Sequence, residues 1–238
     1  MQGGERELEI AGWKVIDYIY MTKPLGKIAV VKNVTIYSAY LLVVWAFYRF
    51  LFQFPEDVEE LFIKPLFWLV PLIYLVRKER QSLLSLGFTF KGLFPAVYLS
   101  IGLGAIFVIE GLVTNYLKYG GFNFAANIGA TPLLASLGLS FATSISEETA
   151  FRGYIFSRLA YALKNELTAN FIQTALWVLI HIPIAFFIWE LTLPASLVYL
   201  GLTAIFGIGS AFIFARTRNV WGSILLHVLW EWPIILFR

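Results

Sequence analysis

The sequence of 238 residues contains no cysteine. A chain without thiols cannot form disulfides, thiolate zinc sites or iron–sulfur clusters, and it has no cysteine nucleophile. Charged residues are also scarce, at 14%, whereas hydrophobic residues reach 59% and the mean hydropathy is +0.76. Soluble globular chains have about a quarter charged residues and about half apolar residues. The composition therefore excludes a disordered chain, a coiled coil and a polar nucleic-acid-binding module, and it predicts a polytopic membrane protein.

The excess of positive charge is small, with a net charge of +3 and a pI near 9.0. In membrane proteins such an excess of lysine and arginine gathers in cytoplasmic loops, so it does not indicate a nucleic-acid partner. The first ten residues, MQGGERELEI, are mixed in charge. They lack the basic stretch and the short apolar core of a cleaved signal peptide.

A membrane-spanning helix needs about 20 mostly apolar residues. Residues 1–34 carry scattered charges and are expected to be cytosolic or interfacial, and residues 35–238 are expected to form one transmembrane domain. We expect an all-α bundle of seven to eight spans, the eighth drawn from 1–34 or 78–100. The seven expected spans are 35–54, 61–76, 93–117, 131–159, 168–189, 193–215 and 220–237.

Lysine and arginine alternate with acidic or neutral connections along these spans. Basic residues precede the first span and follow the second, fourth and sixth, whereas residues 55–60 are acidic. Because basic loops stay on the cytoplasmic side, this pattern predicts a cytoplasmic N-terminus. The basic residues are Lys23, Lys27, Lys32, Arg77, Lys78, Arg80, Lys91, Arg158, Lys164, Arg216 and Arg218.

The fourth expected span contains the densest group of charges, in residues 144–153. A charge inside a span costs at least about 2.5–3.5 kcal/mol, so such a group indicates function. Glu148 and Arg152 are four residues apart and share a helix face, so they are expected to pair. Glu147 is rotated by about 100° from Glu148, which leaves it without this partner and suits it to act as a general base. Other charges lie near span ends and are expected to extend to the interface: Arg49, Lys64 and Glu110.

The chain has two histidines, His181 and His227, and both fall inside expected spans. His227 shares a helix face with Glu231, four residues later. At about 1.5 Å per residue, Glu147, His181 and His227 lie roughly 16, 18 and 10 Å from the cytoplasmic ends of their spans. A single buried histidine is usually structural, but this common depth predicts one shared polar site between the midplane and the cytoplasm.

These residues resemble the motifs of the CPBP (ABI) family, which includes type II CAAX prenyl endopeptidases and bacteriocin-processing or self-immunity proteins. The family's first motif is Glu-Glu-x-x-x-Arg, which Glu147, Glu148 and Arg152 match. Its second motif is an aromatic residue, usually Phe, three residues and then His. Trp177 takes the aromatic position here, and His181 matches.

The third motif of the family is His, three residues and then Asn or Asp. His227 matches it, but Glu231 takes the last position. The three motifs occur in the family's order, and the family core is expected over about 93–238, whereas residues 1–90 carry no matching motif.

The resemblance implies a membrane endopeptidase with a roughly eight-span helical fold and a conical cavity open to the cytosol. Its active site would face the cytosolic half of the bilayer. Catalysis would involve Glu147 as the base, together with Glu148, His181, His227 and Glu231. Arg152 and Trp177 would support the site. The substrate would be a membrane-associated peptide or a prenylated CAAX protein that loses its C-terminal tripeptide.

Two mechanisms stay open. A zinc ion held by Glu147, His181, His227 and Glu231 would make the protein a metalloprotease. Without a metal, Glu147 would activate water alone, and a protonated Glu231 would donate to the oxyanion in place of the family's Asn. A catalytically inactive scaffold or a proton-coupled transporter is the alternative to an enzyme.

Overall fold

The computed structural model describes residues 9–10, 13–14, 23–123 and 133–237, and within them the long apolar stretches fold into seven continuous helical runs. Three of the runs combine several segments and include the π-helical turns η1, η2, η4 and η5. Two short strands, β1 (Glu9–Ile10) and β2 (Trp13–Lys14), pair antiparallel near the N-terminus. The runs are α1 (Lys27–Leu51); α2 (Glu56–Val58), η1 (Glu59–Ile63), η2 (Pro65–Leu69) and α3 (Val70–Lys78); α4 (Leu93–Tyr119); α5 (Leu133–Glu148), η4 (Thr149–Phe156) and α6 (Ser157–Leu163); α7 (Glu166–Pro183) and η5 (Ile184–Ile188); α8 (Leu193–Thr217); and α9 (Val220–Phe237).

The predicted class, an all-helical fold with helices able to span a membrane, is confirmed. Four helices in the described part of the chain are long and apolar enough to cross a bilayer, and Val220–Glu231 is a shorter apolar helix. They are Lys27–Leu51, Leu93–Tyr119, Glu166–Ile188 and Leu193–Thr217. The expected total of seven or eight spans remains a prediction.

Two boundaries differ from the expectation. Helix α1 begins at Lys27 rather than at residue 35, so part of the expected N-terminal segment belongs to the first helix. Between α3 and α4 the chain forms only the 3₁₀ turn η3 (Leu83–Leu86), so no additional span forms before Leu93. The sequence features of residues 1–8, 11–12 and 15–22, and the start of the expected fourth span at 131, lie outside the described residues.

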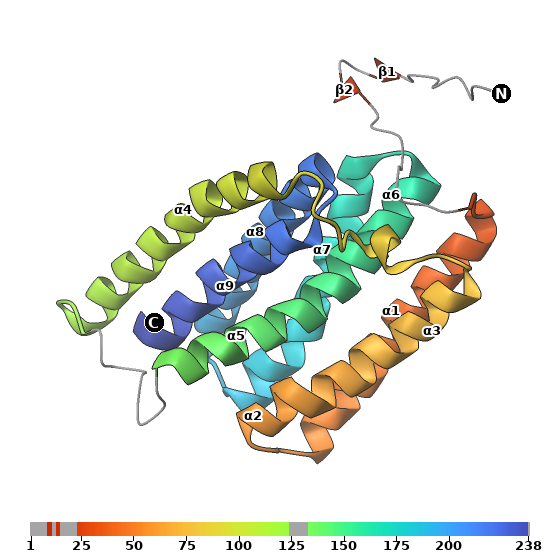
Figure 1. Cartoon of the computed structure of the whole chain (residues 1–238). Coiled ribbons are helices and arrows are strands. Elements are labelled where there is room, and N and C mark those ends of the chain that lie inside the picture. Colours follow the sequence, from red (N-terminus) through yellow and green to blue (C-terminus); the bar gives the residue numbers. More distant parts are fainter. Residues whose placement is uncertain (1–8, 11–12, 15–22, 124–132, 238) are drawn as a thin grey trace.

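The run from α5 to α6 lies in the middle of the bundle (Figure 1). Helices α1 and α3 lie on one side of it, and α9 followed by α4 on the other. Gly104 of α4 permits the close approach of α4 to α9, because a Cβ atom there would lie 2.5 Å from the Leu229 side chain. Small residues of this kind allow helices to pack tightly in membranes.

The connection between α3 and α4 is fixed against the start of α6. Arg158 is fully buried, and its Nε atom donates to Glu79 at 2.9 Å. The same guanidinium donates to the carbonyl and the hydroxyl of Ser85. The Tyr154 hydroxyl and the Asn33 amide donate to Glu79 as well. This network holds residues 79–86 across one end of the bundle.

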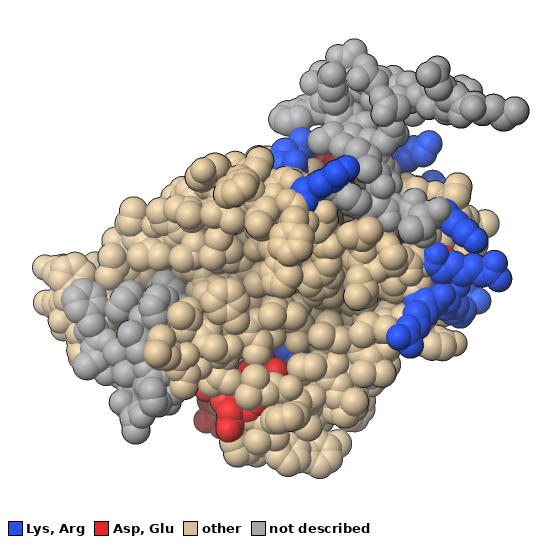
Figure 2. Space-filling view, in the orientation of Figure 1, with Lys and Arg blue, Asp and Glu red and all other residues tan. Residues whose placement is uncertain are grey.

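The same end is tied to the turn between α8 and α9. The Asn219 amide donates to the carbonyls of Thr89 and Lys91, and the Val220 N–H donates to the Gly87 carbonyl. We call this end the basic end, because lysine and arginine gather there at the upper and right edges of Figure 2. The opposite end, with the 52–58 and 189–192 connections, is called the acidic end. Its exposed acidic residues are Glu56, Asp57 and Glu190.

Candidate active site

A cavity of about 1170 Å³ lies in the half of the bundle that is nearer the acidic end. Glu147 of α5, His181 of α7, and His227 and Glu231 of α9 all line it. The structure therefore brings together, from three helical runs, four residues that the sequence placed in one site.

Glu148, the residue after Glu147, is fully buried and does not itself line the cavity. Arg152 Nη1 donates to its Oε1 atom at 3.1 Å, as expected from the four-residue spacing. The Ser210 hydroxyl donates to the other oxygen, Oε2, at 2.6 Å. The Arg152 guanidinium lies over the Trp177 ring, with Cζ 4.5 Å from the ring centroid. Glu148 is therefore a carboxylate with its partners fixed on both oxygens.

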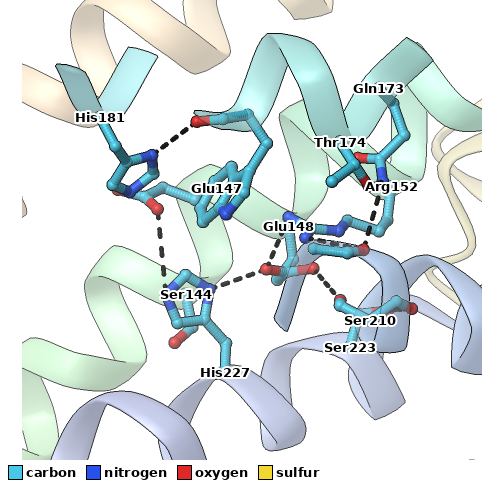
Figure 3. A network of polar contacts seen from close by, with 12 residues as sticks. Ser144, Glu147, Glu148, Arg152, Gln173, Thr174, His181, Ser210, Ser223 and His227 are labelled. Carbon is cyan, nitrogen blue, oxygen red and sulfur yellow. Dashed lines mark hydrogen bonds and ion pairs between the residues drawn. The ribbon is translucent and has the colours of Figure 1, made fainter. Parts of the chain in front are cut away.

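The imidazole of His227 lies between the two glutamates of the first motif, as Figure 3 shows. Its Nδ1 atom is 2.7 Å from Glu148 Oε1, and its Nε2 atom is 3.9 Å from Glu147 Oε2. Because an ionised Glu148 can only accept, the proton of a neutral His227 belongs on Nδ1. The unprotonated Nε2 then faces Glu147 and the cavity.

Glu147 has a partner that the sequence analysis did not assign. Lys64 Nζ donates to Glu147 Oε1 at 2.8 Å and to Glu60 Oε1 at 2.6 Å. The Thr143 hydroxyl donates to Glu60 Oε2 at 2.6 Å. The expectation that Glu147 lacks a charged partner was therefore wrong, and the carboxylate is held ionised by a buried ammonium.

Lys64 was expected to extend to the interface, but it is only 3% exposed. It turns inward because two carboxylates and the faces of Trp45 and Trp68 surround its ammonium group. The sequence did contain a signal for this position. Lys64 is the one charge within the apolar stretch 61–76, and it lies four residues after Glu60.

Arg49 and Glu110 also line the cavity instead of pointing to the membrane surface. Arg49 Nη1 pairs with Glu59 at 2.5 Å, and its guanidinium lies over the Trp45 ring. Glu110 accepts from the Thr114 hydroxyl at 3.0 Å. The half of the cavity nearer the acidic end is therefore more highly charged than the motifs alone predicted.

Trp177, which takes the aromatic position of the second motif, is fully buried. Its ring centroid lies 4.4 Å from that of His181 and 5.7 Å from that of His227. His181 Nδ1 is 2.7 Å from the Trp177 carbonyl, which can only accept, so the proton of a neutral His181 is on Nδ1. Its Nε2 atom is then an acceptor, and the imidazole interacts electrostatically with Glu147.

Glu231 reaches the cavity that His227 lines, as the four-residue spacing predicted. Its Oε2 atom is buried and has no hydrogen-bond partner among the described residues. A buried polar atom without a partner is costly, so such an atom in a cavity is suited to contact a ligand.

Residues 129–233 match the family model described as "Rce1-like: Type II CAAX prenyl endopeptidase Rce1-like". The match covers 105 of the 238 residues. The resemblance inferred from the three motifs is thereby confirmed. No curated protein and no solved structure matches the chain.

The Rce1-like domain contains all seven motif residues, but it does not contain Lys64 or Glu60. The carboxylate of Glu147 is therefore paired with a residue from the part of the chain that precedes the matched range. At the level of the family, the match supports a CAAX-type intramembrane protease.

The residues of the Rce1-like site do not fit a zinc centre. In the described part of the chain, no group of three histidine or carboxylate side chains is arranged to hold a metal ion. The Lys64 ammonium donates to Glu147, and His227 Nδ1 is hydrogen-bonded to Glu148. A cation at Glu147 would face the repulsion of that ammonium.

Proposed function

We propose that the protein is an intramembrane endopeptidase that hydrolyses a peptide bond close to the membrane, with Glu147 as the base that activates water. The observation that supports this most strongly is the placement of Glu147 in the cavity, between Lys64 and the Nε2 atom of His227. The Rce1-like match supports the same class of reaction.

The acceptor atoms of the cavity suit an attacking water. Glu147 Oε2 and the unprotonated Nε2 atoms of His227 and His181 are acceptors without a proton of their own. A water that donates hydrogen bonds to two of these atoms keeps a lone pair for the scissile carbonyl carbon. Glu147 takes one proton as the carbon–oxygen bond forms, and the proton then passes to the leaving amine as the carbon–nitrogen bond breaks.

The surrounding pairs hold these acceptors in place. Glu148, fixed by Arg152 and Ser210, orients the imidazole of His227 and sets its tautomer. Lys64 holds the Glu147 carboxylate through its Oε1 atom and leaves Oε2 directed to His227. Preorganised groups of this kind contribute to catalysis because they need no rearrangement during the reaction.

Glu231 is proposed as the donor to the developing oxyanion. Its Oε2 atom is buried in the cavity without a partner, so a protonated carboxyl there has a hydrogen bond to give. The mechanism assigns no step to a metal ion, because the side chains of the site do not fit one.

The test is hydrolysis of quenched fluorescent peptides by the purified protein, in a panel that includes prenylated CAAX peptides and unmodified membrane-anchored peptides. Glu147→Gln should lower kcat/KM by about 10²–10⁴-fold, which is the usual contribution of a general base. Glu190→Gln is the matched control, because Glu190 is exposed at the same end and does not line the cavity. Equal activity of Glu147→Gln and wild type would refute the assignment. Proton flux in liposomes without peptide cleavage would support the transporter alternative.

A further inference from the structure

The cavity opens at the acidic end of the bundle. The exposed residues among those that line it include Phe54, Trp189 and Val198, which are 46%, 49% and 63% exposed. Phe54 precedes α2, Trp189 follows η5, and Val198 lies near the start of α8. All three are therefore at the end of the helices where α1 meets α2 and α7 meets α8, which we call the mouth.

The other end of the bundle is closed. Residues 79–92 cross it and are bonded to α6 through Glu79, Arg158 and Ser85. Asn219 and Val220 hold the same connection from the side of α9. Glu166 at the start of α7 pairs with Arg216 and Arg218 at the end of α8. A peptide can therefore reach Glu147 from the acidic end, whereas hydrogen bonds and ion pairs close the basic end.

The charges of the connections assign these two ends to opposite sides of a membrane. The connections at the basic end carry lysine and arginine, including Arg77, Lys78 and Lys164. Those at the acidic end carry Glu56, Asp57 and Glu190, and one exposed lysine, Lys118, lies nearby in the last turn of α4. Short loops rich in lysine and arginine stay in the cytoplasm. A cytoplasmic N-terminus and a cavity open to the cytosol therefore cannot both hold in this structure.

The charge of the cavity favours one kind of peptide. Five carboxylates line it besides Glu231, which is proposed to be protonated, and so do three cationic side chains. All three cations already have partners: Arg49 and Lys64 are paired with carboxylates, and the Lys118 ammonium lies over the Tyr119 ring. At the mouth, Glu56 and its neighbour Asp57 are exposed, and Figure 2 shows acidic side chains in red at the lower edge of the molecule. An acidic entrance attracts positive charge and repels negative charge.

We infer that the cavity receives its peptide from the non-cytoplasmic side of the membrane, and that this peptide carries lysine or arginine near the bond to be cleaved. The inference about the peptide rests on the proposed endopeptidase function, whereas the inference about the side of entry does not.

The side of entry can be tested without any activity, because the chain contains no cysteine of its own. Glu56→Cys places a thiol at the mouth, and Lys78→Cys places one at the exposed end of α3. In intact spheroplasts a membrane-impermeant maleimide should label Glu56→Cys at once and Lys78→Cys only after permeabilisation. Labelling of Lys78→Cys in intact spheroplasts, or protection of Glu56→Cys until permeabilisation, would overturn the inference.

The charge of the peptide is tested by binding to the Glu147→Gln protein, so that cleavage does not intervene. Two fluorescent peptides of equal length and hydrophobicity, one with lysines and one with glutamates around the central bond, are compared. The lysine peptide should bind about tenfold more tightly at low salt, and Glu56→Lys should remove most of that preference. Equal binding of both peptides would refute the charge preference.

The outcomes separate this inference from the proposed function. If the labelling pattern and the preference for the lysine peptide are both as expected but the wild-type protein cleaves no peptide, the side of entry is correct and the proposed endopeptidase function is wrong. If peptides are cleaved but Lys78→Cys is labelled from outside, the endopeptidase holds and the side of entry is wrong.

Discussion

Replacement of Lys64 by methionine removes one charge and keeps a side chain of similar length. In the folded protein the ammonium lies 2.8 Å from Glu147 and 2.6 Å from Glu60, and all three residues are buried. The substitution leaves two buried carboxylates without their cation. Loss of one partner of a buried ion pair costs about 3–5 kcal/mol.

For a chain of this size, 1 kcal/mol corresponds to about 2–4 °C in Tm, so Lys64→Met should lower Tm by roughly 6–20 °C. Thermal unfolding of the purified protein in detergent measures this change. Lys78→Met is the matched control, because Lys78 lies in the same helical run and is exposed. Its Tm should stay within about 2 °C of wild type, since exposed charges contribute little.

A second variant distinguishes the ion pair from simple packing. Lys64→Met combined with Glu147→Gln has one fewer unpaired charge than Lys64→Met alone, so it should recover part of the lost Tm. If Lys64→Met unfolds at the temperature of Lys78→Met, the ammonium does not hold the carboxylates. If the double variant is less stable than Lys64→Met, the loss arises from packing and the argument from charge is wrong.

Three further predictions concern other parts of the site. Arg152→Ala should lower the yield, the Tm and the activity, because it leaves the fully buried Glu148 without its cation. The expected loss in the free energy of unfolding is about 3–5 kcal/mol. Arg77→Ala, at an exposed position, should cause no such loss. A stable and fully active Arg152→Ala protein, measured by thermal unfolding and peptide cleavage, would contradict this. Glu231→Gln should keep activity and extend it to higher pH, since an amide donates at every pH; a pH–rate profile that collapses throughout would refute the role as donor. Incubation with a chelator should leave the rate of cleavage unchanged, because the side chains of the site do not fit a metal; loss of activity that zinc restores would overturn that mechanism.

The parts of the fold and site that the sequence predicted are those encoded by local patterns. Long apolar stretches predicted the helical runs, because a helix satisfies its backbone hydrogen bonds within its own segment in lipid. The four-residue spacing of Glu148 and Arg152 gave their pair, since such residues share a helix face. The matching depths of Glu147, His181 and His227 in their helices predicted that they line one cavity.

The contacts that the sequence did not predict join segments distant along the chain. Lys64 and Glu147 are 83 residues apart, and nothing in the spacing of either motif specifies that their helices are neighbours. A lysine near a span end is usually drawn to the interface, which is why its inward orientation depended on the partners that tertiary packing supplies. The sequence did not predict the closure of the basic end by residues 79–92 either, because this closure depends on the contact between Arg158 and Glu79.

The π-helical segment Thr149–Phe156 separates two halves of one continuous helix. The half before it presents Glu147 to the cavity and Glu148 to His227, and the half after it presents Arg158 to the closed end. Each residue of an α-helix turns the chain by about 100°, so the extra residue of a π-turn sets the rotation of one half relative to the other. Deletion of a single codon in this segment would leave both glutamates in place while turning Arg158 away from Glu79. The position of the closed end relative to the two glutamates therefore depends on the number of residues in this segment.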